Sequence, residues 1–321
     1  MMAQMLSTTP ERDTPTVAVI VPAYNRAKTI RRAIQSVLDQ TYQDYVIIVV
    51  DDASMDDTAA AIAEFADPRV RLVRQTTNGG PAVARNTGIR ASTSPLIAFL
   101  DSDDEWLPDK LEQQVGLMLD APQEVGLIHC GYERRVGAQT AIRLPAARGR
   151  IYSQLLRGNV LAGGCSTILL RRACLEDVGM FDARLRHAED YELWLRVAQR
   201  YAVDAVPRVL VRIYTDEMNR VTDDLDATER AVVVLAERYG KHLPLLEGRR
   251  LLAKQLLHVG ISWFRRGERA NARRVLQASI RLYPLHVWAW IYAALSRLQP
   301  GVYRHVRAVW RSMYHRRIRR R

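Results

Sequence analysis

The chain has 321 residues, enough for one large or two ordinary domains, and its 48% hydrophobic content is normal for a globular core. No apolar run approaches the roughly 20 residues that span a bilayer, and residues 1–15 lack a signal-peptide pattern, so we expect a cytoplasmic protein. The formal charge of +12 suggests nucleic-acid binding until it is located. Residues 301–321 hold eight arginines and no acidic residue, so the rest of the chain carries only +4.

The first 105 residues alternate short apolar runs with amphipathic segments. Continuous apolar runs are typical of strands covered on both faces, and apolar residues at i, i+3 and i+4 are typical of helices that pack on a sheet. This alternation predicts an α/β fold with a mostly parallel sheet and helices on both faces. The predicted strands span 17–21, 46–50, 70–74 and 97–100, and the predicted helices span 29–39, 58–66 and 82–91.

Two of these strands run directly into acidic residues, at Asp51-Asp52 and at Asp101-Ser102-Asp103-Asp104. Open α/β sheets bind ligands at the carboxyl ends of their strands. Like charges in a cluster repel unless a cation or hydrogen-bond donors compensate them, and Mg²⁺ or Mn²⁺ is typically held by one or two carboxylates with phosphate oxygens and water. Asp101-x-Asp103 therefore predicts a divalent metal site. The alternative is a turn in which one of the two aspartates caps the next helix.

The turn after the first strand contains neither G-x-G-x-x-G nor G-x-x-x-x-G-K-[ST], which excludes a dinucleotide fingerprint and a Walker-type phosphate cradle. We therefore expect phosphate to be held through the metal. The three cysteines, Cys130, Cys165 and Cys174, have no C-x-x-C spacing and lie in or beside apolar stretches, so we predict neither a disulfide nor a zinc site.

Later segments are less periodic. Residues 134–150 are basic and contain Gly and Pro, so we predict a loop there, near the second substrate. His129 is interpreted as a core residue of a strand rather than as a ligand. Beyond Asp224 the chain becomes helical, and one helix pair resembles a tetratricopeptide-type unit. The predicted strands are 125–130, 166–170 and two short ones around Pro207 within 203–214; the predicted helices are 108–119, one ending at Gly179, one starting near His187, and 231–239, 245–265 and 270–283.

Four motifs resemble, in order and spacing, those of family 2 glycosyltransferases with the GT-A fold. They are Val19-Ile20-Val21-Pro22-Ala23-Tyr24-Asn25, Val50-Asp51-Asp52-Ala53-Ser54-x-Asp56-x-Thr58, Asn78-Gly79-Gly80 with Ala84-Arg85-Asn86, and Leu100-Asp101-Ser102-Asp103-Asp104. The resemblance covers residues 15–222. It implies inverting transfer of a sugar from a nucleotide diphosphate sugar, with UDP favoured, to an acceptor hydroxyl in cell-surface polysaccharide or glycolipid assembly.

The resemblance also implies residue roles on the donor side. An aspartate can accept the imide N–H of uracil or thymine, a tyrosine ring can stack on the base, and an arginine can meet a phosphate. The implied metal ligands are Asp103, with Asp101 beside it on the metal or the ribose. The implied nucleotide-sugar contacts are Pro22, Ala23, Tyr24, Arg26, Asp52, Arg85, Asp101 and Ser102. For Asp51-Asp52 the alternative is an Asx turn, with Ser54 or Asp56 capping the following helix.

The segment Glu189-Asp190-Tyr191-Glu192-Leu193-Trp194-Leu195-Arg196 resembles the family's E-D-x-x-L-W-L-R helix start. The resemblance implies that Asp190 is the general base that takes the proton from the acceptor hydroxyl. The alternative is that Asp190 only caps the helix, and His187 is a weaker candidate for the same proton. The sequence departs from the family at 215–222, where many members carry a histidine and this chain has none.

We divide the chain into a GT-A domain, 15–222, a helical extension, 223–300, and a basic tail, 301–321. Within the GT-A domain, 15–105 is the nucleotide-sugar half and 106–222 the acceptor half. In the tail, apolar residues recur at helical spacing and form a stripe, and arginines lie outside it. This pattern predicts a helix that lies on the anionic surface at the inner face of the membrane. A solvated basic end, or a helix docked on an acidic patch, is the alternative. The apolar stripe comprises Val302, Val306, Val309, Trp310, Met313, Tyr314 and Ile318.

Two other functions are alternatives for this sequence. A sugar nucleotidyltransferase needs a Gly-rich G-x-G-x-R motif after the first strand, whereas Pro22-Ala23-Tyr24-Asn25 stands there. A nucleic-acid-binding protein is suggested by the pI of 9.9, but the confinement of the charge to the tail argues against it.

Overall fold

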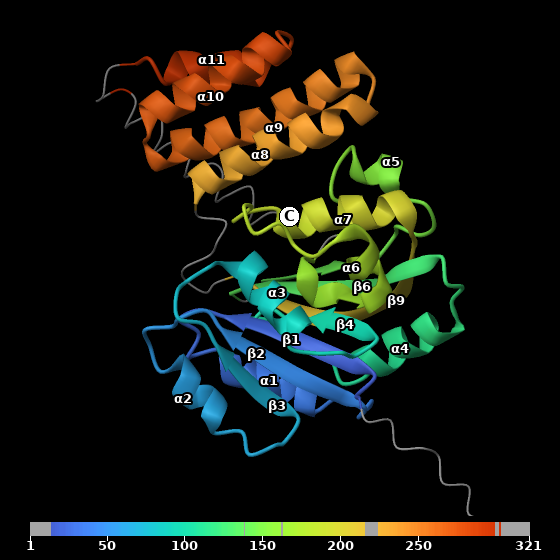
Figure 1. The fold of residues 1–321 in the computed structure, drawn as a ribbon. Coiled ribbons are helices and arrows are strands. Elements are labelled where there is room, and N and C mark those ends of the chain that lie inside the picture. Colours follow the sequence, from blue (N-terminus) through green and yellow to red (C-terminus); the bar gives the residue numbers. More distant parts are fainter. Residues whose placement is uncertain (1–13, 138, 162, 216–223, 299–301, 303–321) are drawn as a thin grey trace, which may run out of the picture. The chain divides into compact units, whose positions relative to one another are not determined.

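The computed structural model describes residues 14–298 except 138, 162 and 216–223, together with residue 302 (Figure 1). The predicted tail, apart from Val302, and the loop after Thr215 lie outside the described residues. The described chain divides into two compact units. The first contains 14–155, 159–183 and 193–215, and the second contains 156–158, 184–192 and the described residues from 224 onward.

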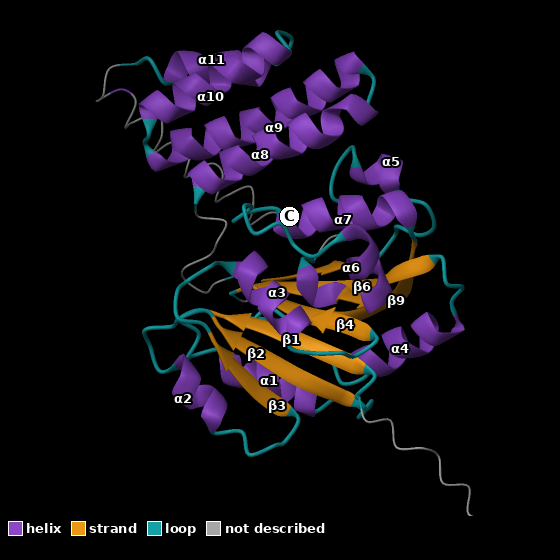
Figure 2. Cartoon of the chain, in the orientation of Figure 1, coloured by secondary structure: helices purple, strands orange, loops and turns teal. Residues whose placement is uncertain are grey.

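One sheet runs through the first unit (Figure 2). Its first four strands are parallel, in the order β3-β2-β1-β4, and the order continues β8-β6-β9-β5 with antiparallel pairs on both sides of β8 and between β9 and β5. The predicted α/β fold is confirmed. The strands are β1 (Val17–Ala23), β2 (Tyr45–Asp51), β3 (Val70–Arg74), β4 (Leu96–Phe99), β5 (Glu105–Trp106), β6 (Val125–Val136), β8 (Ile168–Arg171) and β9 (Ala202–Tyr214).

Every residue of β2 and β4 is buried, because helices cover both faces of the parallel part of the sheet. On one face, α1 (Ile30–Leu38), α2 (Thr58–Ala63) and α4 (Lys110–Asp120) share a core with Val19 and Ile47. On the other face lies α3 (Pro81–Arg90), where Gly88 packs so closely that a Cβ atom would come within 2.5 Å of Ile20. All three cysteines are free and buried.

The register of the strands sets where their ends meet. Ala23 pairs with Asp51, and Ile20 pairs with Phe99, so β1, β2 and β4 end at the same edge of the sheet. The loops that carry the acidic motifs therefore start side by side, as the carboxyl ends of parallel strands require.

Two sequence predictions in this unit were wrong. Residues 134–150 are not one loop, because β6 continues to Val136 and pairs with a further strand, β7 (Gln139–Arg143). Every residue of β7 is exposed, so its sequence lacks the alternation of apolar and polar residues by which a strand is predicted. Residues 202–214 form one strand rather than two, because the β6–β9 register shifts where Pro207 lies, and a bulge tolerates a proline.

The second unit is a set of antiparallel helices around its own core. Trp263 and Phe264 of α9 pack with Val275 and Leu276 of α10, and the close approach of these two helices depends on Gly260, whose Cβ position lies 2.6 Å from Leu276. The helices are α8 (Leu225–Tyr239), α9 (Leu245–Arg266), α10 (Arg269–Leu282) and α11 (Val287–Leu295). The sequence predicted the first three but not α11, which is almost uniformly apolar and therefore has no amphipathic period.

Candidate active site

The loops that follow β1 and β2 are tied to each other by their own polar groups. The N–H of Asn25 donates to Ser54 Oγ (2.9 Å), and the N–H of Met55 donates to Asn25 Oδ1 (2.9 Å). Asn25 and Ala53 both have positive φ, 53° and 60°. For Ala53, which has no side chain to hydrogen-bond locally, this conformation costs about 1 kcal/mol or more. Such strained residues cluster at functional sites, and these two lie within the two predicted donor loops.

Asp52 is buried and fastens three segments together. Its N–H donates to Ala23 O (2.8 Å), while its two carboxylate oxygens accept the N–H groups of Gly79 and Gly80, each at 2.8 Å. Gly80 has φ of 84° and precedes α3, so a residue with a Cβ would be strained there.

The Asx-turn alternative applies to the neighbours of Asp52. Asp51 accepts the N–H of Ser54 (2.9 Å) and lies 3.1 Å from Arg74 Nε, and its side chain is fully buried. Asp56 accepts the N–H of Thr58 (3.0 Å) at the start of α2. Asp51 and Asp56 therefore shape the loop, and the recognition role of Asp52 stays a prediction.

The carboxylates of Asp101 and Asp103 are each close to an arginine. Arg85 of α3 donates to Asp101 Oδ1 (2.7 Å), and Arg26 of the β1 loop lies 3.9 Å from Asp103 Oδ2. The two carboxylate side chains are 33% and 20% exposed, whereas that of Arg85 is only 6% exposed. The site thus combines two reachable carboxylates with two arginines, a charge arrangement suited to a diphosphate and a cation.

Asp104 has a role that the sequence did not assign. The N–H of Asp101 donates to Ser166 Oγ (3.0 Å), and the Ser166 hydroxyl donates to Asp104 Oδ2 (2.6 Å). Burial, and after it the charges of Asp101 and Asp103, hold the pKa of Asp104 well above its usual range. Asp104 therefore belongs to the interior and anchors the loop to the 3₁₀ turn Cys165–Thr167.

The remaining predicted donor residues surround this loop. Tyr24 is exposed and Pro22 half-buried, which suits contact with a ligand, whereas Ala23 and Ser102 are buried. The Ala23 carbonyl is occupied by Asp52, as described above. The Tyr24 carbonyl accepts from Arg26 Nη1 (3.4 Å), so the side chain of Arg26 folds back over its own loop.

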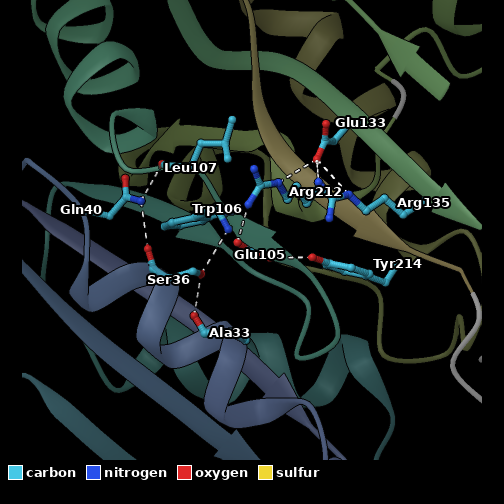
Figure 3. A network of polar contacts seen from close by, with 10 residues as sticks. All are labelled: Ala33, Ser36, Gln40, Glu105, Trp106, Leu107, Glu133, Arg135, Arg212 and Tyr214. Atoms are coloured by element: carbon cyan, nitrogen blue, oxygen red, sulfur yellow. Dashed lines mark hydrogen bonds and ion pairs between the residues drawn. The ribbon is translucent and has the colours of Figure 1, made fainter. Parts of the chain in front are cut away.

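A polar network fixes the chain directly after the acidic loop (Figure 3). Glu105 accepts from Arg212 Nη1 (2.8 Å) and from the Tyr214 hydroxyl (2.7 Å), which joins β5 to the end of β9. Arg212 also donates to Glu133 Oε1 (2.7 Å). The guanidinium of Arg32 lies 3.9 Å from the centre of the Tyr214 ring and donates to the carbonyl of Asp103. The backbone of the metal-ligand candidate is thereby held from α1.

Asp190 and His187 belong to the second unit, at the start of α7 (Glu189–Arg200). Asp190 Oδ1 accepts the N–H of Tyr191 (2.6 Å), and Ala188, just before the helix, has φ of 57°. Burial lowers the pKa of His187. The predicted core positions Leu193, Trp194 and Val197 are all buried.

The first turn of α7 is also held by α8. Glu192 is almost fully buried, and its Oε1 accepts from the Tyr239 hydroxyl (2.9 Å) and from Arg238 Nη1 (3.0 Å). This contact could not be predicted from the sequence, because Arg238 and Tyr239 lie 46 and 47 residues beyond Glu192 along the chain.

Comparison with known proteins decides the family. The model of glycosyl transferase family 2 matches residues 18–179, half of the chain. The chain belongs to glycosyltransferase family 2. The resemblance of the four motifs is confirmed, and the chain is a glycosyltransferase.

Two relatives whose names state a role align with more than half of this glycosyltransferase. It is 34% identical over 266 residues to the succinoglycan biosynthesis protein ExoO of Rhizobium meliloti, covering 78% of this chain and 74% of the relative. It is 35% identical over 190 residues to an Escherichia coli protein, the UDP-Glc:alpha-D-GlcNAc-diphosphoundecaprenol beta-1,3-glucosyltransferase WfgD, covering 59% of this chain and 72% of the relative.

Solved structures share the fold of this glycosyltransferase. TarS of S. aureus, residues 1–349, matches with a TM-score of 0.63 at 18% identity, covering 92% of this chain and 91% of that one. The mannosyltransferase PcManGT of Pyrobaculum calidifontis, in complex with GDP-Man and Mn²⁺, matches with a TM-score of 0.53 at 23% identity, covering 92% and 84%. At these identities the likeness shows the GT-A fold, which confirms the predicted fold class.

A divalent cation fits the residues of the acidic loop. Among the described residues, no three side chains of His, Cys, Asp or Glu converge on one point, so the protein offers no closed cage. Mg²⁺ and Mn²⁺ do not require one, because they are commonly held by one or two carboxylates plus substrate phosphates and water. The side chains of Asp101 and Asp103, which are both partly exposed, match that type of open site.

We expect Arg32→Met to weaken metal-dependent nucleotide binding by roughly tenfold in this glycosyltransferase. The change removes a charge-assisted hydrogen bond to the Asp103 carbonyl, and such bonds contribute about 1.5–3 kcal/mol. Arg32 acts through Asp103, so KM for the donor should rise more than kcat falls, and Arg32→Lys should restore part of the loss. The measurement is a Mn²⁺ titration of nucleotide binding.

The matched control is Arg31→Met, because Arg31 precedes Arg32 on α1 and forms an exposed pair with Glu64. A positioning role for Arg32 is contradicted if the two variants bind metal and nucleotide equally well.

Proposed function

We propose that this glycosyltransferase moves a sugar from a nucleotide diphosphate sugar, with UDP favoured, to an acceptor hydroxyl, with inversion at the anomeric carbon. The observation that carries the proposal is the pairing of Arg85 with Asp101 and of Arg26 with Asp103 beside the buried Asp52. Two carboxylates and two arginines at the carboxyl ends of the strands suit a diphosphate with its cation.

On the donor side, Asp52 accepts the imide N–H of the base, and the exposed ring of Tyr24 stacks on the base. Arg26 and Arg85 meet the phosphates. Pro22, Ala23 and Ser102 shape the walls of the site.

Asp103, with Asp101 beside it, holds Mn²⁺ or Mg²⁺. When bound, the cation supplies positive charge to the diphosphate and so stabilises it as a leaving group. The residues of the chain do the rest of the placement: Arg32 and Ser166 hold the backbone of the loop, and Arg85 keeps the Asp101 carboxylate oriented.

Asp190 acts as the general base. It takes the proton from the acceptor hydroxyl while that oxygen attacks the anomeric carbon from the face opposite the leaving diphosphate. Its place at the start of α7, next to the positive φ of Ala188, supports a fixed carboxylate, and burial lowers the pKa of the neighbouring His187, which favours its neutral form.

We propose a lipid-linked or polysaccharide acceptor in bacterial envelope assembly. The name of the E. coli relative specifies UDP-Glc and a diphosphoundecaprenol-linked acceptor, that of ExoO specifies succinoglycan biosynthesis, and TarS has been solved with UDP-GlcNAc. These names support a UDP-sugar donor and a lipid-linked or polysaccharide acceptor, which we place at the inner face of the membrane. The tail, 301–321, would then attach this cytoplasmic enzyme to an anionic surface.

The test is thermal unfolding of the full chain with UDP, GDP and dTDP and their sugars, with and without Mn²⁺. A ligand at 100 times its Kd stabilises the folded state by about 2.7 kcal/mol, which shifts the unfolding temperature measurably. We expect the largest shift with a UDP-sugar and Mn²⁺. If none of the nucleotide diphosphates or their sugars shifts the unfolding temperature, the proposal is contradicted. A larger shift with GDP or dTDP than with UDP would correct the identity of the nucleotide.

A further inference from the structure

The outer face of α11 is apolar and exposed. Residues 282–296 contain no Asp, Glu, Lys or Arg, and the only residue among them that titrates near neutral pH is His286. Leu285 is 75% exposed, Trp288 55% and Trp290 53%, with Val287 and Ile291 exposed beside them. We call these five residues the α11 face. The opposite side of the helix is a true core face, because Ala289 and Ala293 are buried and the Tyr292 ring meets Phe264 edge-on at 5.1 Å.

This face is more apolar than the outer side of α8, and elsewhere in the bundle Leu245 and Leu246 are also exposed. The helix at the other end of the set, α8, exposes charged residues, among them Asp226, Arg230 and Glu237. Terminal helices of stacked helical arrays ordinarily carry such a polar outer surface, because solubility requires it. A nine-residue helix with two exposed tryptophans therefore indicates a surface that is covered when the protein functions.

The chain from Arg269 onward, which includes the α11 face, is strongly basic. No acidic residue occurs after Glu268, whereas residues 269–321 contain thirteen arginines, so this segment carries more than the net +12 of the whole chain. Exposed Arg281 and Arg297 stand at the two ends of the apolar stretch. Burial, and after it the positive charges of Arg250 and Lys254 of α9, lower the pKa of His286. The surroundings thus suit a partner that is apolar at its centre and anionic at its rim.

An anionic bilayer has that chemistry. Tryptophan is favoured at the boundary between headgroups and acyl chains, where its ring is buried and its N–H stays near polar groups, and arginines contact the anionic headgroups. The aliphatic residues Leu285, Val287 and Ile291 distinguish this surface from a nucleic-acid site, which uses aromatic stacking and phosphate contacts. Among the described residues, no helix is both long and apolar enough to cross a membrane.

We propose that the α11 face docks on an anionic membrane surface, with its tryptophan and aliphatic side chains at the headgroup boundary. This inference goes beyond the proposed function, because it assigns membrane contact to a described helix of the extension and holds whatever sugar is transferred. The tail adds electrostatic attraction, and the α11 face supplies the apolar contact.

The experiment compares full-length Leu285→Ser/Trp288→Ser with full-length Leu119→Ser/Ile142→Ser in vesicle flotation. The control pair is equally exposed, 66% and 61%, and lies in the first unit. With phosphatidylglycerol-containing vesicles we expect the partitioning of the α11 variant to fall by about tenfold or more, because serine cannot bury the apolar area that Leu285 and Trp288 place in the membrane. The control variant should float like the native chain. Both variants keep every arginine, so the difference reports the apolar contact alone.

Three results would overturn the inference. They are equal flotation of the two variants, binding to phosphatidylcholine vesicles as strong as to anionic ones, and a concentration-dependent dimer of the native chain that the α11 variant abolishes. Circular dichroism checks that both variants fold. The Mn²⁺- and nucleotide-dependent thermal shift should be unchanged in the α11 variant, so a failure of docking is separate from a failure of the proposed function.

Discussion

Asp103→Ala is expected to lower sugar transfer by at least about 10²–10³-fold, the cost of removing one electrostatic stabiliser of developing charge. The side chain of Asp103 is partly exposed, and its backbone carbonyl, which the change retains, accepts from Arg32. The change should therefore leave the unfolding temperature of the apo protein nearly unchanged. It should also abolish the extra thermal shift that Mn²⁺ gives to nucleotide binding, which is the direct measure of metal retention.

Asp120→Ala is the matched control, because Asp120 is an exposed carboxylate at the end of α4. It should keep both activity and the Mn²⁺ effect. Full turnover of Asp103→Ala in the presence of a chelator would show that Asp103 holds no metal.

Asp190→Asn is expected to lower kcat by at least ~10²-fold, the typical contribution of a general base. Asparagine keeps the shape of the side chain and caps helices as well as aspartate, so the helix should persist. Because the change removes only the proton acceptor, the donor-induced thermal shift should stay native. The measurement is single-turnover transfer at saturating donor, which separates chemistry from binding.

Two neighbouring variants locate the base. Glu189→Gln should retain activity, whereas Glu192→Gln should lower both activity and the unfolding temperature, because Glu192 accepts from Arg238 and Tyr239. An active Asp190→Asn protein beside an inactive Glu189→Gln protein would move the role to Glu189.

The sequence predicted the parts of the fold that depend on local pattern. β1, β2 and β4 are continuous apolar runs, and their register places Asp52 and Asp101 at one edge without any long-range information. The exposed strand β7 and the uniformly apolar α11 were missed because neither has a contrast between a buried and an exposed side. Pro207 suggested a break that a bulge in the β6–β9 register absorbs.

The candidate site divides in the same way. Asp101 and Asp103 are recognisable because acids at a strand end are unusual, whereas their supports come from distant segments. Ser166 is 65 residues from Asp101, and Arg32 is 71 residues from Asp103. Nothing in the neighbourhood of a lone serine or arginine marks such a partner, so only the folded chain could identify them.

The contact between Glu192 and α8 has a consequence for dissecting this enzyme. Glu192 is a buried carboxylate in the first turn of α7, and two of its donors, Arg238 and Tyr239, lie after residue 222. A truncated protein that stops there would keep the acid and lose these two donors, and removing partners of a buried charge is destabilising by several kcal/mol. The helix that carries Asp190 and the helical extension are thus one thermodynamic piece, and a minimal catalytic fragment has to extend at least through Tyr239.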